Sequence, residues 1–304
     1  MATITEKRTY KTIVIEQIFD SRWDPVNQVL TADLVTLKDL SEAIKHFNSH
    51  VPTGFKPMSD RNPANFFKDF IRRTSSANRY WPKSVLSRGY TAQQVTGAGN
   101  SFRFKVLPAG QITAFVESES NYPQFPGKEC KFRIQSLSLD YKARLLGRRD
   151  ESWFMQVAAK LSLVQSHLAL CSERIFIEVS ELQQSLKQSG AEIDGLFLGK
   201  VTPQISMLIT VEAKGRKDDV LQIQIVAQVN AVMKMKSIQK NLNAIAGDPN
   251  NFYILPMAMK VIEESVVYIA EYEPIKYVKN GRIAAVKLER ESLCQIMPSV
   301  EGIS

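Results

Sequence analysis

The sequence contains few cysteines and no long hydrophobic run. Cys130, Cys171 and Cys294 lie far apart in the 304-residue chain and form no CxxC pattern. This spacing argues against a cysteine-based zinc site and favours free, mostly buried thiols in a reducing compartment. No stretch approaches the roughly 18–20 apolar residues that a membrane span needs, and the charged N-terminus has no apolar signal core. We therefore expect a cytoplasmic protein that does not span a membrane.

Acidic residues are in the minority. Lysines and arginines number 39 and aspartates and glutamates 31, which gives a formal net charge of +8. A basic balance suits a polyanionic partner such as nucleic acid, because each phosphate that is neutralised releases counterions. An incidentally basic surface is the alternative. With 44% hydrophobic and 23% charged residues, the chain is expected to be globular, and its length suits one large domain or two ordinary ones.

One basic segment, from Arg72 to Lys105, contains no aspartate or glutamate at all. Tyr80, Trp81 and Tyr90 are interleaved with its charges, and its amide side chains can pair with the edges of adenine bases. We interpret the segment as facing DNA; a solvated basic loop between a helix and a strand is the alternative. The residues expected to contact DNA there are Arg72, Arg73, Arg79, Lys83, Arg88, Gln93, Gln94, Asn100 and Arg103.

The region 191–216 has the pattern of two strands joined by a turn near Pro203. Apolar and polar residues alternate along both strands, so every second side chain lies on one face. Glu212 and Lys214 therefore share a face of the second strand. If Asp194 on the first strand lies opposite Glu212, the hairpin brings two carboxylates and a lysine together at its open end.

Periodicity also predicts the elements around this hairpin. Apolar residues at steps of three and four, together with N-cap residues, indicate helices. The predicted helices span 33–48, 62–73, 150–170, 181–188 and 218–235. Short apolar or alternating runs indicate strands. The predicted strands span 9–19, 101–107, 174–179, 251–261 and 265–272; 277–288 is expected to form an exposed hairpin, and the tail after Cys294 to be loose.

The charged residues of the hairpin have the chemistry that phosphodiester hydrolysis requires. A divalent metal must polarise the phosphoryl oxygen and lower the pKa of a bound water. Asp194 and Glu212 can supply carboxylates and Ala213 a backbone carbonyl, which are oxygen ligands that Mg²⁺ accepts. Lys214 can orient the nucleophile or stabilise charge, and Arg216 extends the positive potential toward a phosphate backbone. The alternative is a solvated strand face with a Glu–Lys pair.

Asp194-Gly195 on one strand and Glu212-Ala213-Lys214 on the next resemble the motif of the PD-(D/E)XK nucleases, and are most similar to that of type II restriction endonucleases. The predicted order of helix, hairpin, helix and strand from 150 to 262 is similar to the αβββαβ core of that superfamily. The resemblance implies a restriction-endonuclease-like α/β fold, in which helices flank a central mixed β-sheet. The strand at 174–179 and the helix after it would then be an insertion or an extra edge element.

The sequence departs from the family pattern at some positions. Ile193 precedes Asp194 in place of the family's proline, which many members tolerate, and the only acid within the preceding helix is Glu151 at its start. Glu151 and Glu192 are accessory candidates. Some repair nucleases of the superfamily carry a glutamine on the following helix. The glutamines available for that position are Gln222, Gln224 and Gln228.

The resemblance implies a Mg²⁺-dependent type II restriction endonuclease that acts on specific sequences of double-stranded DNA, commonly as a homodimer. Asp194, Glu212 and Lys214 would be catalytic, and Asp194, Glu212 and Ala213 would bind the metal. Residues 150–304 would form the catalytic core. By elimination, 1–149 would serve DNA recognition and dimer contacts, either separately or continuous with the core. A structure-specific repair or recombination nuclease of the same fold and a non-catalytic DNA-binding protein are the alternatives.

Overall fold

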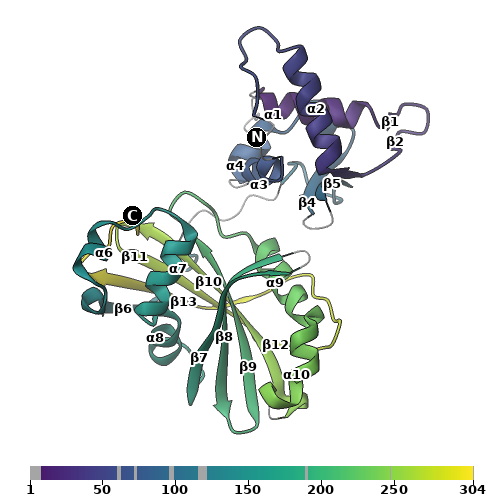
Figure 1. Cartoon of the computed structure of the whole chain (residues 1–304). Coiled ribbons are helices and arrows are strands. Elements are labelled where there is room, and N and C mark those ends of the chain that lie inside the picture. Colours follow the sequence, from purple (N-terminus) through teal and green to yellow (C-terminus); the bar gives the residue numbers. More distant parts are fainter. Residues whose placement is uncertain are drawn as a thin grey trace. The chain divides into compact units, whose positions relative to one another are not determined.

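A computed structural model describes residues 8–59, 63–71, 74–95, 99–115, 122–188, 191–246 and 248–303. The chain divides into two compact units, Met1–Ser118 and Glu119–Ser304 (Figure 1). The division falls before residue 149 because β6 (Cys130–Gln135) pairs in parallel with β13 (Leu288–Met297) and so belongs to the second unit. None of the helices in these ranges is long and apolar enough to cross a membrane.

The first unit packs helices against a three-stranded antiparallel sheet of order β3-β5-β4. Its strands are β3 (Leu34–Thr36), β4 (Tyr90–Gln94) and β5 (Asn100–Val106), and a separate ribbon joins β1 (Trp23–Asp24) to β2 (Val29–Leu30). Its helices are α1 (Tyr10–Asp20), α2 (Leu37–Ser49), α3 (Asn65–Ile71), α4 (Thr74–Tyr80) and α5 (Lys83–Ser87). Aromatic side chains dominate its core, where the rings of Phe67 and Phe102 stack with centroids 4.5 Å apart.

The strand expected at 9–19 is wrong, because these residues form α1. Thr9 caps the helix: its side chain accepts a hydrogen bond from Thr12 N, and the Thr12 hydroxyl accepts one from Thr9 N. The buried side chains of this helix are Val14, Ile15, Ile18 and Phe19. Their spacing puts them on one face of a helix. A short apolar run is ambiguous between strand and helix, and here the cap identifies the helix.

A mixed sheet of eight strands forms the centre of the second unit, in the order β6-β13-β11-β10-β9-β8-β7 with β12 paired to β10. Its other strands are β7 (Glu178–Gln188), β8 (Ala191–Thr202), β9 (Ile205–Lys214), β10 (Phe252–Glu263), β11 (Val266–Tyr272) and β12 (Ile275–Lys276). Neighbours among β7, β8 and β9 are antiparallel, whereas β10 runs parallel to β9. The predicted fold class, an α/β fold with a central mixed sheet flanked by helices, is confirmed.

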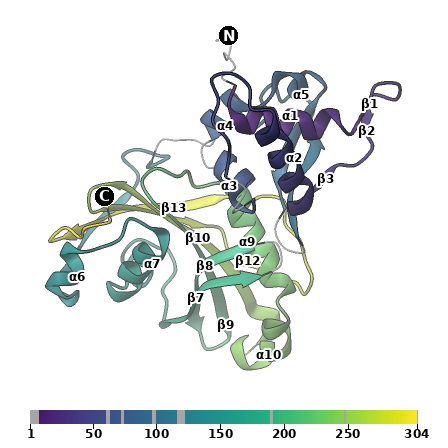
Figure 2. The same cartoon turned by 45° about the horizontal axis from the view of Figure 1, so that its top comes forward.

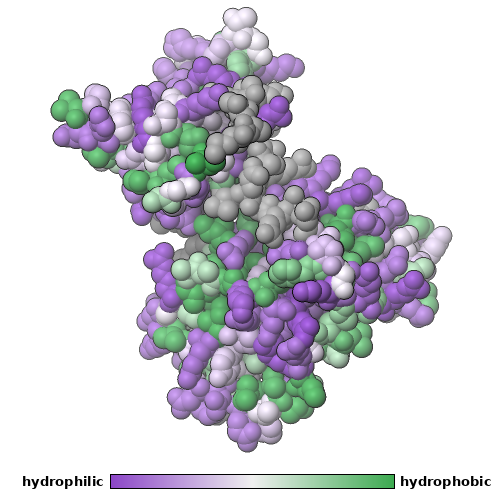
Figure 3. All heavy atoms as spheres, turned by 180° about the vertical axis from the view of Figure 1, so that it is seen from behind, coloured by the Kyte–Doolittle hydropathy of each residue, from purple (hydrophilic) through white to green (hydrophobic). Residues whose placement is uncertain are grey.

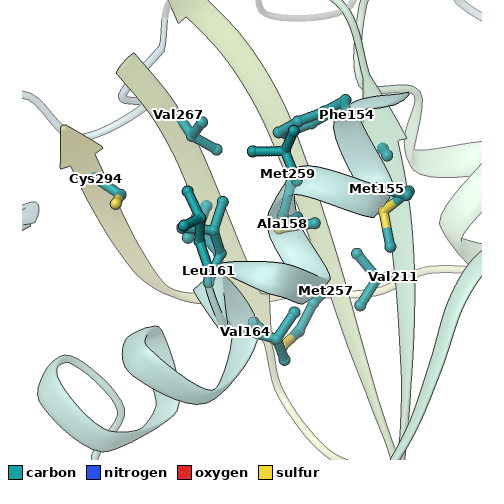
Figure 4. Packing of buried hydrophobic residues seen from close by; sticks show 14 of the residues in the cluster. Phe154, Met155, Ala158, Leu161, Val164, Val211, Met257, Met259, Val267 and Cys294 are labelled. Carbon is teal, nitrogen blue, oxygen red and sulfur yellow. The ribbon is translucent and has the colours of Figure 1, made fainter. Parts of the chain in front are cut away.

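Helices cover both faces of this sheet (Figure 2). On one face, α7 (Glu151–Lys160) places Phe154 and Ala158 in a cluster with Val211 and Met257, and α8 (Leu163–Leu170) adds Val164 (Figure 4). On the other face, α9 (Gln222–Lys234) and α10 (Lys236–Ala246) place Val232 in a second cluster from β8, β9 and β10. These two helices form the crossover that a parallel neighbour of β9 requires. Because both faces are covered, β9 is buried along almost its whole length.

Four predicted elements of the second unit differ from the structure. Of the strand expected at 174–179, only the last two residues lie in a strand, because β7 begins at Glu178. The helix expected at 181–188 is wrong, because these residues belong to β7, and pairing with β8 overrides their helix propensity. β7 is therefore the first of three consecutive antiparallel strands, and it lies at the edge of the sheet, which agrees with the expected extra edge element. The helix expected at 150–170 is interrupted at Ser162, whose φ of 52° lies in the left-handed region. In place of the hairpin expected at 277–288, residues up to 287 form turns and irregular structure.

The expectation of three free thiols is wrong for two of the cysteines. Cys130 at the start of β6 and Cys171 after α8 form a disulfide. Cys294 on β13 is free and buried. The two bonded cysteines are remote in sequence, and they meet only because β6 joins the sheet of the second unit.

The C-terminal tail, expected to be loose, packs against the start of α7. Glu301 N donates to the carbonyl of Arg144, at the end of α6 (Tyr141–Leu145), over 2.7 Å. The indole N–H of Trp153 on α7 donates to the carbonyl of Glu301 over 3.1 Å. Val300 and Ile303 are buried. The tail therefore helps to hold the first turn of α7 in place.

Candidate active site

The hairpin of β8 and β9 turns at Pro203, as expected from the sequence, and its open end gathers the candidate residues. Gly195 pairs with Val211, so Asp194 and Glu212 are the next residues outward on the two strands. The backbone N–H of Ala213 donates to Asp194 Oδ2 over 2.8 Å. Asp194 therefore lies against the Glu212-Ala213-Lys214 segment.

Lys214 and Glu212 form a buried ion pair at the end of β9. They are 6% and 3% exposed, and Lys214 Nζ lies 2.5 Å from Glu212 Oε1. Lys214 Nζ also donates to the Ala213 carbonyl and to Glu151 Oε1, both over 3.2 Å. Burial alone would lower the pKa of Lys214, but the charges of Glu212, Glu151 and Asp194 outweigh burial and raise it. The ammonium is therefore a stable cation surrounded by oxygen atoms.

Asp194 is a carboxyl group of the cluster with a shifted pKa. Burial and the charge of Glu212 raise its pKa to about 7, although Lys214 and the N–H of Ala213 favour the ionised form. A carboxyl group that titrates near neutrality among other charged groups is typical of a functional site. A bound cation would favour its ionised form for the same electrostatic reason.

Glu151 reaches the cluster from the first turn of α7. Asp150 caps this helix, and its Oδ1 accepts a hydrogen bond from Trp153 N over 2.7 Å. The cap and the C-terminal tail fix where α7 begins, and Glu151 Oε1 consequently lies 3.2 Å from Lys214 Nζ. The accessory candidate on the preceding helix thus has a direct contact in the cluster.

Gln228 is the glutamine of α9 that reaches the site. It is 1% exposed, and its Nε2 donates to Glu212 Oε2 and to the carbonyl of Glu192, the latter over 3.0 Å. Gln222 instead donates to the carbonyl of Val286 over 2.7 Å. Glu192, the other accessory candidate, is exposed and contributes its backbone carbonyl to this contact.

The oxygen donors of the cluster suit a hard divalent cation. The carboxylates of Asp194 and Glu212 and the carbonyl of Ala213 are ligand types that Mg²⁺ accepts, and one or two carboxylates are sufficient for it. Within the described ranges, no three Asp, Glu, His or Cys side chains converge as a ready-made metal centre. Gln228 Oε1 is buried without a hydrogen-bond partner in that part of the chain, so a further oxygen atom is available beside Glu212.

In the folded first unit, acidic residues from other parts of the chain neutralise some of the arginines of the basic segment. Arg88 pairs with Asp20 over 2.5 Å, and Arg103 pairs with Asp33 over 3.3 Å. Both acids come from chain outside the acid-free segment. Trp81 belongs to the core, where its indole N–H donates to the carbonyl of Tyr90. A continuous array of cations and aromatic rings facing DNA therefore does not follow from the sequence pattern alone.

Other candidate DNA contacts differ in exposure. Arg79 on α4, Lys83 on α5 and Arg216 after β9 are exposed. Gln93 on β4 lies opposite Arg103 on β5. The partly buried candidates are Gln93, Gln94 and Asn100. Arg72 and Arg73 lie outside the described residues. Hydrophilic side chains are abundant elsewhere on the surface (Figure 3), so exposure alone does not identify a DNA-binding face.

Models of protein families, curated proteins and solved structures give no match to this chain. The class of the site must therefore be argued from its geometry. Two carboxylates, a lysine and a backbone carbonyl lie at the ends of adjacent strands. The two flanking helices add one carboxylate and one amide, from Glu151 and Gln228.

Proposed function

We propose that the chain is a Mg²⁺-dependent endonuclease of the type II restriction class, which hydrolyses phosphodiester bonds of double-stranded DNA at specific sequences. The observation that carries this proposal is the convergence of Asp194, Glu212 and Lys214 beside the Ala213 carbonyl. The order of elements supports it. A helical pair precedes β7, β8 and β9, and a second helical pair leads to the parallel strand β10, as in the αβββαβ core that the sequence resembles.

In this role each residue of the cluster has its own task. Asp194, Glu212 and the Ala213 carbonyl would hold Mg²⁺, which supplies a Lewis acid and a bound water of lowered pKa. Lys214 stays protonated at neutral pH because the surrounding carboxylates raise its pKa. It would orient the attacking water and stabilise the negative charge that develops on the phosphate. Glu151 would hold the ammonium of Lys214 in position.

A structure-specific repair or recombination nuclease of the same fold is the second candidate. Its supporting observation is the hydrogen bond from Gln228 to Glu212, because a glutamine on the following helix is a feature of some repair nucleases of the superfamily that the sequence resembles. The separate first unit favours the restriction class, since recognition of a DNA sequence needs surface beyond the catalytic core.

Duplex DNA is the proposed substrate, and a homodimer is the proposed assembly. The exposed cations Arg79, Lys83 and Arg216 would contact phosphates. One cluster can attack one strand, so two copies of the chain would allow both strands to be cut. A non-catalytic DNA-binding protein would need the same cations but none of the chemistry at Lys214.

The experiment that tests the proposal compares Lys214→Ala with Lys200→Ala. Lys200 lies on the same hairpin and is exposed, which makes it a matched control. We expect Lys214→Ala to slow Mg²⁺-dependent plasmid cleavage by about 10²–10³-fold, the usual loss when one charge-stabilising donor is removed. DNA binding measured in Ca²⁺ should persist. Lys200→Ala should cut like the unmodified chain.

The products distinguish the candidate functions. Discrete fragments from a plasmid of known sequence indicate a restriction enzyme, whereas nicks or a smear indicate the structure-specific nuclease. Cleavage by Lys214→Ala at the unmodified rate would show that the site is elsewhere. Binding without any Mg²⁺-dependent cleavage by the unmodified chain would leave the non-catalytic protein.

A further inference from the structure

Lys260 is a buried charged residue that the proposed chemistry does not use. It lies on β10 directly beside Lys214 of β9 in the parallel register, and it is 5% exposed. Its Nζ donates to the backbone carbonyls of Gly215 over 3.2 Å, Arg216 over 3.1 Å and Asp218 over 2.6 Å. One ammonium group therefore gathers three carbonyls of the loop that leaves the end of β9.

A second side chain holds the same loop. Val220 N donates to the hydroxyl of Tyr122 over 3.1 Å, and Lys260 Nζ lies 5.3 Å from the centre of the Tyr122 ring. Within the loop, Asp218 N donates to the Gly215 carbonyl over 3.3 Å and closes a turn. Lys260 and Tyr122 both belong to the second unit, as does the loop itself.

The position of Lys260 determines the direction of the N–H groups of this loop. In a trans peptide, the C=O of one residue and the N–H of the next point in opposite directions. The cis peptide bonds of the described ranges lie elsewhere, before Pro123 and Pro298. Since the carbonyls of Gly215, Arg216 and Asp218 point to Lys260, the N–H groups that follow them point away from it. Those N–H groups belong to Arg216, Lys217 and Asp219.

The outer side of the loop therefore combines backbone donors with cations. Successive N–H groups in a turn form a concavity that binds anions, and Arg216 and Lys217, next to each other, are both exposed. Asp218 and Asp219 follow in the same loop and are less exposed than the two cations. Apart from its two chain neighbours, no atom of the described residues lies within 4 Å of the place where a Cβ of Gly215 would be, so space is open at the start of the loop.

We propose that the loop 215–219 is a phosphate-binding site, and that Lys260 is the positioning residue that turns its donors outward. The ligand is a phosphate of the DNA backbone, an assignment that rests on the proposed function. Gly215 directly follows Lys214 in the chain, so a phosphate held by the loop would fix the DNA backbone beside the reacting group. Lys260 itself is buried beneath the loop and acts on DNA only through it.

The test measures binding of a duplex oligonucleotide in Ca²⁺ by fluorescence anisotropy at several salt concentrations. The loop variant is Arg216→Ala with Lys217→Ala. Its matched control is Lys236→Ala with Lys240→Ala, which removes the same charge from exposed positions on α10. We expect the loop variant to weaken binding at least about tenfold and to lower the slope of log K against log salt by about two. The control should leave the slope unchanged.

Lys260→Met tests the positioning role. We expect it to weaken DNA binding and raise KM with little change in kcat. In the loop variant its further loss should be smaller than in the unmodified chain, because both changes act on the same loop. A full additive loss in that background would overturn the positioning role. An unchanged salt slope in the loop variant would overturn the phosphate site. If Lys260→Met does not fold, as judged by circular dichroism, the loop variant, whose changes are exposed, still tests the phosphate site through its salt slope.

The same measurements separate this proposal from the proposed function, because anisotropy does not require cleavage. If the unmodified chain never cuts DNA but the loop variant binds DNA more weakly, the phosphate site is supported and the nuclease function is contradicted. If the loop variant and the unmodified protein both cut DNA with the same KM, the nuclease function is supported and the phosphate site is contradicted.

Discussion

Gln228 on α9 links the crossover helix to strand β9 by donating a hydrogen bond from its amide to Glu212 Oε2. Glu212 Oε1 faces Lys214 Nζ over 2.5 Å. The two oxygens of Glu212 are thus held by groups from two different elements, which fixes the orientation of the carboxylate. A metal ligand that is oriented in this way needs little rearrangement before it binds.

Gln228→Leu should lower both the free energy of unfolding and the Mg²⁺-dependent cleavage activity. Glu212 Oε2 would lose a buried donor, which typically reduces stability by about 1–3 kcal/mol. Loss of a group that orients a metal ligand typically lowers activity by about 10–100-fold. Urea unfolding and Mg²⁺ titration of plasmid cleavage measure the two effects. Gln204→Leu in the exposed turn of the same hairpin is the control; equal behaviour of the two variants would contradict the role of Gln228.

Asp194→Asn should stabilise the metal-free protein at alkaline pH. The pKa of Asp194 is raised from 3.8 to about 7 in the folded chain, so between these values the folded state binds more protons than the unfolded one. Stability therefore falls as pH rises through this window, and the full loss is present above pH 7. At about 1.4 kcal/mol for each pKa unit, this loss of stability amounts to at most about 4 kcal/mol. Asparagine does not ionise, so the variant avoids the loss.

Melting temperatures in EDTA measure this difference. The variant should melt above the unmodified chain at pH 8, and the difference should shrink as pH falls and disappear below the unfolded pKa of 3.8. Added Mg²⁺ should raise the melting temperature of the unmodified chain more than that of Asp194→Asn. A constant difference between the variants across this pH range would show that Asp194 does not titrate within it.

The hairpin could be predicted from the sequence because its determinants are local. Alternation sets the strand faces, Pro203 marks the turn, and Asp194 and Glu212 follow from the register. The acid at the start of α7 was also visible in the sequence, since an N-cap aspartate immediately precedes Glu151. The choice of Gln228 among three glutamines required the rotation of α9 against the sheet, which its amphipathic pattern alone did not fix.

Other features depend on which distant segments become neighbours. The sequence of β7 favours a helix, and only pairing with β8 makes it a strand. Asp20 and Asp33 neutralise arginines of a segment that contains no acids of its own. Lys260 had no special pattern in the sequence, because its three acceptors are backbone carbonyls about forty residues earlier in the chain. Every residue has a backbone carbonyl, so the residue types do not indicate which carbonyls accept hydrogen bonds.

Glu271 should be important for stability, because its fully buried carboxylate contacts three side chains, those of His167, Ser172 and Arg174. His167 Nε2 lies 3.1 Å and Arg174 Nη1 2.7 Å from its carboxylate oxygens. Burial would raise the pKa of Glu271, but its hydrogen bonds and the positive charge of Arg174 lower it overall. Glu271→Leu removes a buried carboxylate from this network, although Arg174 keeps Glu289 and His167 keeps Ser292. The free energy of unfolding should fall by up to about 3–5 kcal/mol at pH 7.

The pH dependence gives a second check on Glu271. A lowered pKa in the folded state contributes stability above pH 4.5, the ordinary value, and this contribution disappears as pH falls through the folded value. The difference between Glu271→Leu and the unmodified chain in urea unfolding should therefore shrink at acid pH. Glu273→Leu removes an exposed partner of Lys287 and should cost less than about 1 kcal/mol. Equal losses in both variants would contradict the buried pairing.

The disulfide between Cys130 and Cys171 should be detectable by counting thiols. Cys294 is buried, and burial raises the pKa of its thiol to about 12, so it should not react in the folded protein. A thiol reagent should therefore find none in the native chain and one after unfolding. After pretreatment with a mild reductant, the reagent should find two thiols in the native chain and three after unfolding, since the chain has three cysteines. Three thiols in the unfolded, unreduced chain would show that the bond is absent.

The same bond should contribute to stability. It closes a loop with a sequence separation of 41, for which the chain-entropy relation gives at most about 4 kcal/mol. Reduction, or Cys130→Ser with Cys171→Ser, should lower the urea midpoint accordingly. Cys294→Ser is not an adequate control, because it changes a core residue; the unmodified chain with and without reductant is the direct comparison. No change in midpoint on reduction would mean that pairing with β13 alone holds β6 in the sheet.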